Sequence, residues 1–378
     1  MKKIGVLTFH KSINYGSVLQ TWALCKVLKD YETYVIDYQP DNYNEIYGIF
    51  TLNKGIKYNL NRILNLYAIK NQINKFAEFR SNNLNCTKHY SSNSLKEEDL
   101  NNFDVIVTGS DQIWNVHAED ADDVFFLPYD VKGKKIAYAC SVNNTNFSES
   151  RCDENLKNYI LDYDFISIRE NSGANKVKKF INNKKNIYTM LDPTLLNEKE
   201  LYEEITSERI VKEPYIFLYN VWSGFTAIEA AKKISNITGL PVYTAMMDSR
   251  IKQIYKIEKE GIKVETRHTS PEDFLSLIKY SEMIITESFH GTAFSLIFEK
   301  QFVCINSKNL SGKLKNDERI TNVLNIVDLE DRYISIEDIS DFDFTKSIDY
   351  QIVTKKRLEQ AEYCKSILFD AIEGKVKS

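Results

Sequence analysis

Short runs of apolar residues alternate along this chain with longer segments in which apolar residues recur every three or four positions. The short runs predict buried β-strands, and the longer segments predict amphipathic helices. In the first half, this pattern predicts strands at residues 4–9, 34–37, 104–107, 135–139 and 165–168, with helices at 17–28 and 171–181. Such an alternation is typical of parallel α/β sheets, so one doubly wound domain is expected here.

A polar and acidic segment at residues 197–213 separates this half from a second series of apolar runs. A helix is predicted to begin at Ser270, because Ser270 can cap it, Pro271 suits its first turn and Asp273 lies three residues after the cap. The other elements predicted in this half are strands at 215–219, 241–245, 262–264, 283–286 and 302–305 and helices at 226–237, 291–298 and 349–372.

Together these elements predict an α/β fold with two Rossmann-like, doubly wound domains that face a cleft. The predicted bounds are 1–205 for the N-terminal domain, which includes an insertion at 43–85, and 206–345 for the C-terminal domain. Residues 346–378 are expected to form a helix that braces the first domain. The length of 378 residues agrees with two domains, because one hydrophobic core rarely supports so long a chain.

The composition excludes several classes of protein. Apolar residues make up 43% of the chain and charged residues 27%, which is typical of globular proteins and not of disordered or fibrous ones. The net charge of −4 creates no strong field that would attract nucleic acid or an anionic membrane. We therefore expect no nucleic-acid partner, and an anionic ligand must be held by local groups.

The sequence contains no pattern typical of a metal site or of a membrane span. The six cysteines lack the paired spacings of zinc sites and the five histidines contain no i, i+4 pair, so no metal is expected. The apolar run at 4–9 is too short for a signal peptide, and no apolar stretch reaches the roughly 20 residues of a membrane span, so we expect a cytoplasmic protein. Apolar residues at 60–66 leave peripheral membrane association or a partner contact open, although burial explains them equally well.

One histidine lies where a predicted strand gives way to a helix. Residues 283–285 are apolar, the predicted strand ends in polar residues such as Thr286 and Ser288, and the helix is expected at or just after Gly291. Open α/β sheets bind ligands at such strand ends, where the N–H groups of the helix attract anions. We expect His290 to be neutral in the empty site, because the helix dipole disfavours its charge, and to gain a proton beside an anion. His290 is therefore a candidate general acid, with a capping or core histidine as the alternative.

The loop after the first predicted strand contains His10, Asn14, Tyr15 and Gly16. Gly16 permits close approach of the backbone, and Asn14 or Ser17 can cap the helix that follows. The loop lacks the Lys of a P-loop and the spaced glycines of a dinucleotide fingerprint, so binding of ATP or NAD is not indicated. Ligand binding and simple helix capping explain it equally well.

Other predicted elements also place polar residues at their ends. Arg169 is suited to two-pronged binding of a carboxylate or phosphate, with a surface salt bridge as the alternative. Arg319 opens a late helix, from which it can reach an anion in the cleft. The strand at 104–107 is followed by residues whose polar groups and ring suit a sugar, although a turn with a buried Trp is an equal alternative: Ser110, Asp111, Gln112, Trp114 and Asn115.

Five segments in order give the chain a resemblance that no single segment would support. They read FHKSINYGSVLQ at 9–20, GSDQIWN at 109–115, SIRE at 167–170, LDPT at 191–194 and SFHGT at 288–292. In order and spacing, over about residues 1–325, they resemble the polysaccharide pyruvyl transferase family. The resemblance implies a fold similar to GT-B glycosyltransferases and a bacterial enzyme of cell-surface polysaccharide or exopolysaccharide biosynthesis.

The activity implied by the resemblance is transfer of pyruvate from phosphoenolpyruvate, as co-substrate and without another cofactor, onto sugar hydroxyls as a ketal. The acceptor is then a sugar or a lipid-linked oligosaccharide on the N-terminal domain, and the donor lies on the C-terminal domain. His290 matches the family's His-Gly motif, whose histidine is taken as the acid, and Arg169 matches an arginine associated with the donor anion. Ser288, Gly291, Thr292 and Arg319 are expected near the donor.

One position departs from the family pattern, because many relatives carry Arg where this chain has Ser288. Arg319 or Lys313 can replace that charge, or this branch uses another donor. A GT-B-like glycosyltransferase with a nucleotide-sugar donor and a non-catalytic glycan-binding protein are therefore alternative functions. The sequence indicates neither the acceptor sugar nor the oligomeric state.

Overall fold

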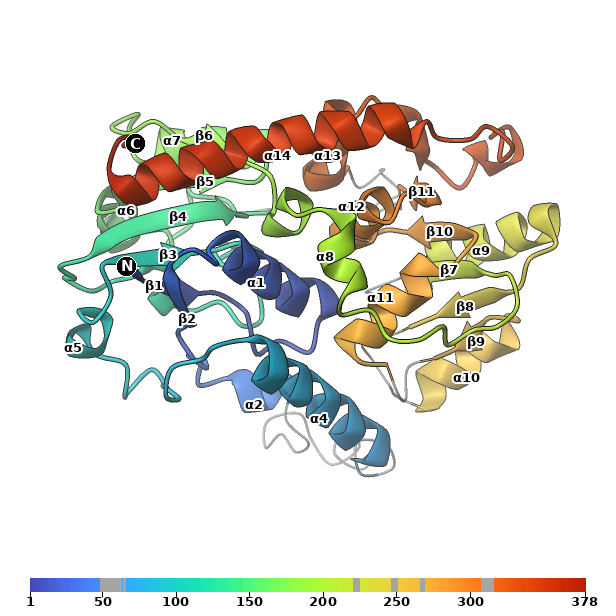
Figure 1. Cartoon of the computed structure of the whole chain (residues 1–378), viewed down its shortest axis with the longest axis horizontal. Helices are drawn as coiled ribbons and strands as arrows, with labels where there is room; N and C mark the ends of the chain where they lie inside the picture. Colours follow the sequence, from blue (N-terminus) through green and yellow to red (C-terminus); the bar gives the residue numbers. More distant parts are fainter. Residues whose placement is uncertain are drawn as a thin grey trace.

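The computed structural model describes residues 1–47, 63, 66–143, 145–219, 225–245, 251–265, 269–306 and 316–378. Within this part of the chain, two six-stranded sheets lie side by side, each covered by helices, as Figure 1 shows. Every pairing between named strands is parallel. This arrangement confirms the prediction of two Rossmann-like units.

The first sheet has the strand order β2-β1-β3-β4-β5-β6, and β3 and β5 are buried along their whole length. The order reverses between β1 and β3, and such a switch point is where an open α/β sheet binds ligands. The two-residue β6 was not predicted, because it is too short to show a periodic pattern. The bounds are β1 (Lys3–Leu7), β2 (Glu32–Val35), β3 (Val105–Thr108), β4 (Lys134–Cys140), β5 (Phe165–Ile168) and β6 (Tyr188–Thr189).

The second sheet has the order β12-β11-β10-β7-β8-β9, which is the strand order of a Rossmann fold read from its opposite edge. Its switch point lies between β7 and β10. The equally short β12 also escaped prediction. The bounds are β7 (Ile216–Tyr219), β8 (Val242–Thr244), β9 (Lys263–Val264), β10 (Met283–Thr286), β11 (Gln301–Ile305) and β12 (Tyr333–Ile334).

Helices cover both faces of the sheets (Figure 1). The helix predicted at Ser270 is confirmed: Ser270 Oγ accepts from Asp273 N at 3.1 Å, and Asp273 Oδ2 accepts from Ser270 N at 2.8 Å. In the first half the helices are α1 (Tyr15–Val27), α2 (Tyr43–Ile46), α4 (Leu66–Asn83), α5 (Glu97–Leu100), α6 (Glu154–Leu161), α7 (Asn171–Phe180) and α8 (Lys199–Glu203). In the second half they are α9 (Phe225–Thr238), α10 (Ile251–Lys259), α11 (Pro271–Lys279), α12 (Phe289–Ile297), α13 (Glu318–Ile326) and α14 (Tyr350–Glu373).

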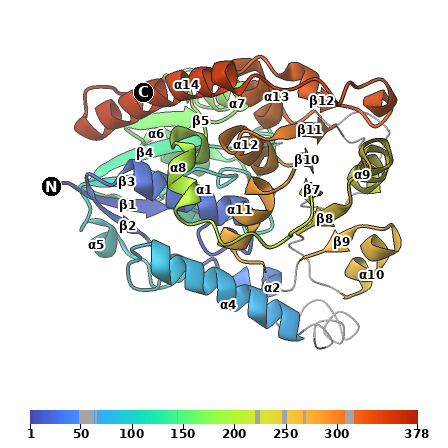
Figure 2. The same ribbon diagram turned by 45° about the vertical axis from the view of Figure 1, so that its right-hand side comes forward.

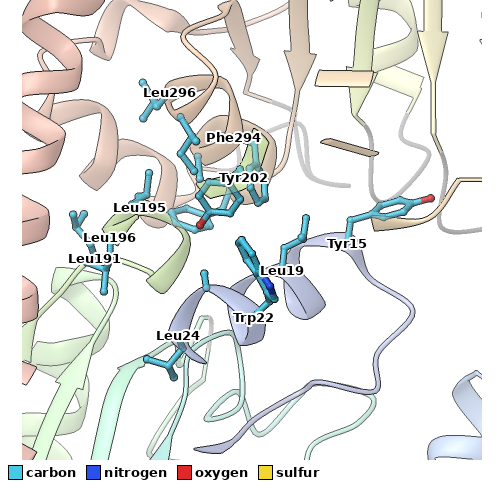
Figure 3. Packing of buried hydrophobic residues seen from close by; sticks show 14 of the residues in the cluster. Tyr15, Leu19, Trp22, Leu24, Leu191, Leu195, Leu196, Tyr202, Phe294 and Leu296 are labelled. Atoms are coloured by element: carbon cyan, nitrogen blue, oxygen red, sulfur yellow. The ribbon is translucent and has the colours of Figure 1, made fainter. Parts of the chain in front are cut away.

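One hydrophobic core runs from the first sheet to the second. Figure 3 shows Trp22 of α1, Tyr202 of α8 and Phe294 of α12 in this core, with ring centroids 5.3 Å apart for the first pair and 5.5 Å for the second. These aromatic contacts bury large areas between elements of the two halves. The two sheets are therefore held in a fixed relation around the site.

The last helix lies across both halves, as Figures 1 and 2 show. The buried Arg357 of α14 donates to the carbonyl oxygens of Leu195 at 3.0 Å and Asn197 at 2.8 Å. Farther along, Lys134 of β4 donates to the carbonyl oxygen of Ile372 at 3.0 Å. These contacts agree with a bracing helix, while the three domain bounds stay a prediction.

The described part of the predicted insertion at 43–85 consists of α2 and α4, and the rest of it lies outside the described residues. Helix α4 packs against α11 of the second half, where Lys75 Nζ lies 2.9 Å from Asp273 Oδ2. Most of the apolar run at 60–66 also falls outside the described residues. Among those that are described, no helix is both long and apolar enough to cross a membrane.

Candidate functional site

His290 lies in the first turn of α12, directly after the switch-point strand β10. The helix begins at Phe289 with Ser288 as its N-cap, so the prediction of a start at Gly291 was late by two residues. The imidazole is only 7% exposed and faces Gly16 at the start of α1. A Cβ atom at Gly16 would lie 2.1 Å from His290 Nδ1, so only glycine lets α1 approach this histidine.

The start of α1 joins the two halves of the molecule beside this contact. Asn14 caps the helix, since its side-chain oxygen accepts from Gly16 N at 2.9 Å and from Ser17 N at 3.4 Å. The Tyr15 ring stacks on Phe274 of α11 with centroids 4.7 Å apart. Tyr15 is fully buried, so it holds the two halves together and does not face an open cleft.

Arg169 and Asp192 form a buried ion pair next to His290. Arg169 follows β5 and donates from one terminal nitrogen to Asp192 Oδ2 at 2.6 Å. The same oxygen accepts from Ser110 Oγ at 2.9 Å and lies 3.8 Å from His290 Nε2. Burial is the largest effect and acts to raise the pKa of Asp192, but Arg169, His290 and the hydrogen bonds from Thr194 together outweigh it, and the net shift is downward. Asp192 is therefore ionised at neutral pH.

His290 is a neutral imidazole in the ligand-free protein. Burial lowers its pKa, Asp192 and Asp111 act to raise it, and Arg169 and Arg319 act to lower it, with a net downward shift. We predicted a neutral imidazole from the helix dipole, and burial is the leading cause in the structure. Because Asp192 is held ionised, the group here that can gain and release a proton is His290.

Several buried polar atoms around this pair have no hydrogen-bond partner among the described residues. They are His290 Nε2, Arg169 Nε and the second terminal nitrogen of Arg169. Buried polar groups are normally satisfied, so such atoms in one place indicate a ligand site. Sequence reasoning missed Asp192 as the residue that lies next to both side chains, although the LDPT segment contains it.

A cavity of about 330 Å³ adjoins the ion pair of Arg169 and Asp192, and His290 lies next to Asp192 without lining the cavity itself. It is lined by residues of both halves, including Arg169, Asp192, Phe289 and Arg319. The Arg169 guanidinium lies over the Phe289 ring, 4.4 Å from its centroid, which holds the charged group at the cavity wall. This volume is at the lower end of the range for small-molecule pockets.

The family model for polysaccharide pyruvyl transferases matches residues 14–309, which include every group described so far except Arg319. This chain belongs to the polysaccharide pyruvyl transferase family. It is accordingly a transferase, and the family implies a sugar or oligosaccharide acceptor. No curated protein sequence matches the chain significantly.

Solved structures similar to this family member share its fold at low sequence identity. The UDP complex of Staphylococcus aureus MnaA has a TM-score of 0.54 at 10% identity, covering 99% of this chain and 96% of that one. A putative UDP-N-acetylglucosamine 2-epimerase from Listeria monocytogenes has a TM-score of 0.50 at 10% identity, covering 98% and 95%. A trehalose-6-phosphate synthase has a TM-score of 0.51 at 8% identity and covers both chains completely. These likenesses confirm the GT-B-like arrangement.

On the side expected to bind the donor, Arg319 lines the cavity. Ser288, Gly291 and Thr292 belong to the N-cap and first turn of α12. Asp317 holds Arg319 through two hydrogen bonds, of 2.8 Å and 2.5 Å, and Arg319 in turn lowers the pKa of Asp317 against the effect of burial. Ser288 is half-buried. A Cβ atom at Gly291 would lie 2.1 Å from Thr286 Oγ1, so this glycine lets α12 pack closely on β10.

Thr292 donates its hydroxyl to the carbonyl oxygen of Ser288 at 3.1 Å, which places it within α12 and away from the cavity wall. Lys313 and His268 lie outside the described residues. Among those that are described, no group of three or more metal-ligating side chains occurs.

On the side expected to bind the acceptor, Asp111 lies near Arg169. Its Oδ2 accepts from Ser17 Oγ at 2.5 Å, and its Oδ1 lies 3.8 Å from Arg169. Gln112 and Asn115 follow it and are linked to each other by a hydrogen bond of 3.1 Å.

Two residues expected on the acceptor side do not face the cleft. Trp114 is fully buried, donates Nε1–H to the carbonyl oxygen of Phe125 at 3.2 Å and stacks on Phe126. Its ring face is therefore not open to a sugar, and the alternative of a buried Trp is the one observed. His10 is also buried, with its Nε2 2.9 Å from Asp37 Oδ1, so it fixes the loop after β1.

Proposed function

We propose that this chain transfers the pyruvyl group of phosphoenolpyruvate onto sugar hydroxyls as a ketal during the synthesis of cell-surface polysaccharide. The observation that supports this reaction best is the pairing of a buried, neutral histidine with a buried arginine whose remaining nitrogens have no hydrogen-bond partner among the described residues. An anion on Arg169 brings negative charge beside His290, which favours its protonated form. The site then holds both an anion and an acid.

The reaction needs a proton donor, an electrophile and a leaving group. His290 gives a proton to the methylene carbon of phosphoenolpyruvate, and the central carbon becomes electron-poor. An acceptor hydroxyl attacks that carbon, the bond to the phosphate oxygen breaks, and a second hydroxyl completes the ketal. One hydroxyl proton restores His290, and the other leaves with the phosphate.

The two anionic groups of the donor require cations. Arg169 offers its remaining nitrogens to one of them, and Arg319, which also lines the cavity, binds the other. Arg319 thereby supplies the charge that Ser288 lacks. We place the acceptor, a sugar or a lipid-linked oligosaccharide, on the side of Asp111. We place the reaction in the cytoplasm of a bacterial cell, with transient contact with the membrane when the acceptor is lipid-linked.

Thermal unfolding with candidate donors tests this proposal without a known acceptor, because a ligand that binds only the folded state raises the midpoint. Phosphoenolpyruvate at about 100 times its Kd should add about 2.7 kcal/mol of stability. The shift should vanish in Arg169→Ala and persist in His290→Ala, since the histidine acts on the reaction more than on binding. A shift with uridine or guanosine diphosphate sugars, and none with phosphoenolpyruvate, would support a glycosyltransferase instead.

A further inference from the structure

Asp192 is a carboxylate that lies against functional groups of both halves of the molecule. It is fully buried at the start of the turn Pro193–Leu196, and its Oδ2 faces Arg169 of the first half and His290 of the second. Its other oxygen, Oδ1, accepts from Thr194 N at 3.0 Å and from Thr194 Oγ1 at 2.7 Å. The carboxylate is thus fixed on one side and presented to both functional groups on the other.

We propose that Asp192 is a positioning residue, which orients Arg169 for the donor anion and supplies the fixed negative charge that lets His290 accept a proton when the donor binds. This inference rests on the proposed function. It adds that both halves are needed to protonate the acid, because His290 follows a strand of the second sheet and its counter-charge, Asp192, follows a strand of the first.

The alternative that Asp192 is itself the acid conflicts with its surroundings. Arg169 donates to it at 2.6 Å, and Ser110 and Thr194 donate three further hydrogen bonds, all of which favour the ionised form. The nearby Tyr138 and Tyr202 are neutral, since burial raises the pKa of both hydroxyls. Asp192 therefore has no proton to give at neutral pH.

The charges that face His290 come from four elements. Asp192 follows β6, Asp111 follows β3, Arg169 follows β5 and Arg319 opens α13, where Asp317 pairs with it. An anion that binds here adds negative charge, which favours the protonated imidazole. Removal of the Asp192 charge takes away the carboxylate that lies 3.8 Å from His290 Nε2, so most of that gain should be lost.

Proton uptake on anion binding measures this effect directly. Sulfate is the probe, because it carries no titratable proton near neutral pH, and calorimetric titration in two buffers of different ionisation enthalpy counts the protons taken up. The wild type should take up about one proton per bound sulfate, because the anion raises the pKa of His290. Asp192→Asn should bind sulfate with almost no uptake, since loss of a counter-charge at this distance lowers the pKa of His290 by about one to three units.

Two further variants show which residue takes up the proton. His290→Gln should abolish the uptake while sulfate still binds, which shows that the proton goes to His290. Asp192→Glu keeps the charge and should keep the uptake with weaker binding. It also keeps the test decisive if Asp192→Asn fails to fold, because a folded Asp192→Glu protein without uptake would overturn the inference.

The outcomes separate this inference from the proposed function. Equal proton uptake in the wild type and in Asp192→Asn overturns the inference alone. Sulfate binding without uptake in the wild type overturns the inference and also contradicts the role of His290 as the acid in the proposed function. A wild type that binds neither sulfate nor phosphoenolpyruvate contradicts the proposed function, and the inference falls with it.

Discussion

Replacement of Gly16 by alanine tests whether the contact between α1 and His290 sets the position of the acid. The added Cβ atom would lie 2.1 Å from His290 Nδ1 and 2.4 Å from its Cγ, whereas ordinary contacts begin at 3.4 Å. The imidazole must therefore retreat by more than about 1 Å, and a misplacement of that size costs about 10²-fold in rate.

The effect should appear in kcat and leave the fold intact. Overpacking of a core costs about 1–3 kcal/mol, and the gain from replacing a helical glycine by alanine offsets up to about 1 kcal/mol of this. Gly16 makes no hydrogen bond to Arg169 or Arg319 among the described residues, so the KM for phosphoenolpyruvate should change by less than about threefold. The assay is steady-state phosphate release from phosphoenolpyruvate, with the acceptor that gives the highest wild-type rate.

Gly5→Ala is the matched control. Its Cβ would lie 2.9 Å from Ile36 Cδ1 in the core of the first half, so it overpacks a core without touching the site. We expect this variant to lose stability and keep its rate within about twofold, as distant sites act independently. If the Gly16→Ala protein turns over at nearly the wild-type rate, the position of His290 does not depend on its close contact with Gly16.

Other perturbations probe the donor site, the protonation of His290 and the buried Trp. Arg169→Lys keeps a charge but loses the planar fork, so KM for phosphoenolpyruvate should rise about tenfold or more, and an unchanged KM would contradict the donor contact. Burial lowers the pKa of His290 and of His10, so the unfolded chain binds more protons below about pH 6.5, and the free energy of unfolding should fall as the pH drops through that range. Sulfate affinity should instead rise as the pH falls from about 8 to about 6, since binding raises the pKa of His290, and a flat profile would contradict this coupling. Trp114→Ala should cost about 3–5 kcal/mol of stability in denaturant unfolding, and a stable variant with lost acceptor binding would place the ring in the acceptor site.

Local patterns in the sequence predicted the elements well where periodicity and capping define them. The alternation of apolar runs located the main strands of both sheets, and the capping box at Ser270 fixed the start of α11. Two-residue strands such as β6 and β12 escaped, because pairing with a neighbouring strand defines them and their own pattern does not.

The geometry of the candidate site was only partly predictable. Polar residues at strand ends indicated His290, Arg169 and Asp111, because parallel strands bring such residues to one edge of a sheet. The contact of Gly16 with His290 and the double role of Asp192 depend on how two sheets pack, which no local pattern records. For Trp114, the sequence allowed both a sugar site and a turn with a buried ring. The packing of the folded chain decides between them, and the ring is buried.

The most direct test of the proposed function follows the pyruvyl group itself. Phosphoenolpyruvate labelled with ¹³C in its methylene carbon is incubated with the enzyme and a mixture of polysaccharide precursors, and the glycans are examined by NMR. We expect a labelled methyl signal of a ketal on a glycan, with equimolar release of phosphate, in the wild type and not in His290→Ala. Absence of label in the glycan with wild-type enzyme, together with sugar transfer from a nucleotide-sugar, would contradict pyruvyl transfer.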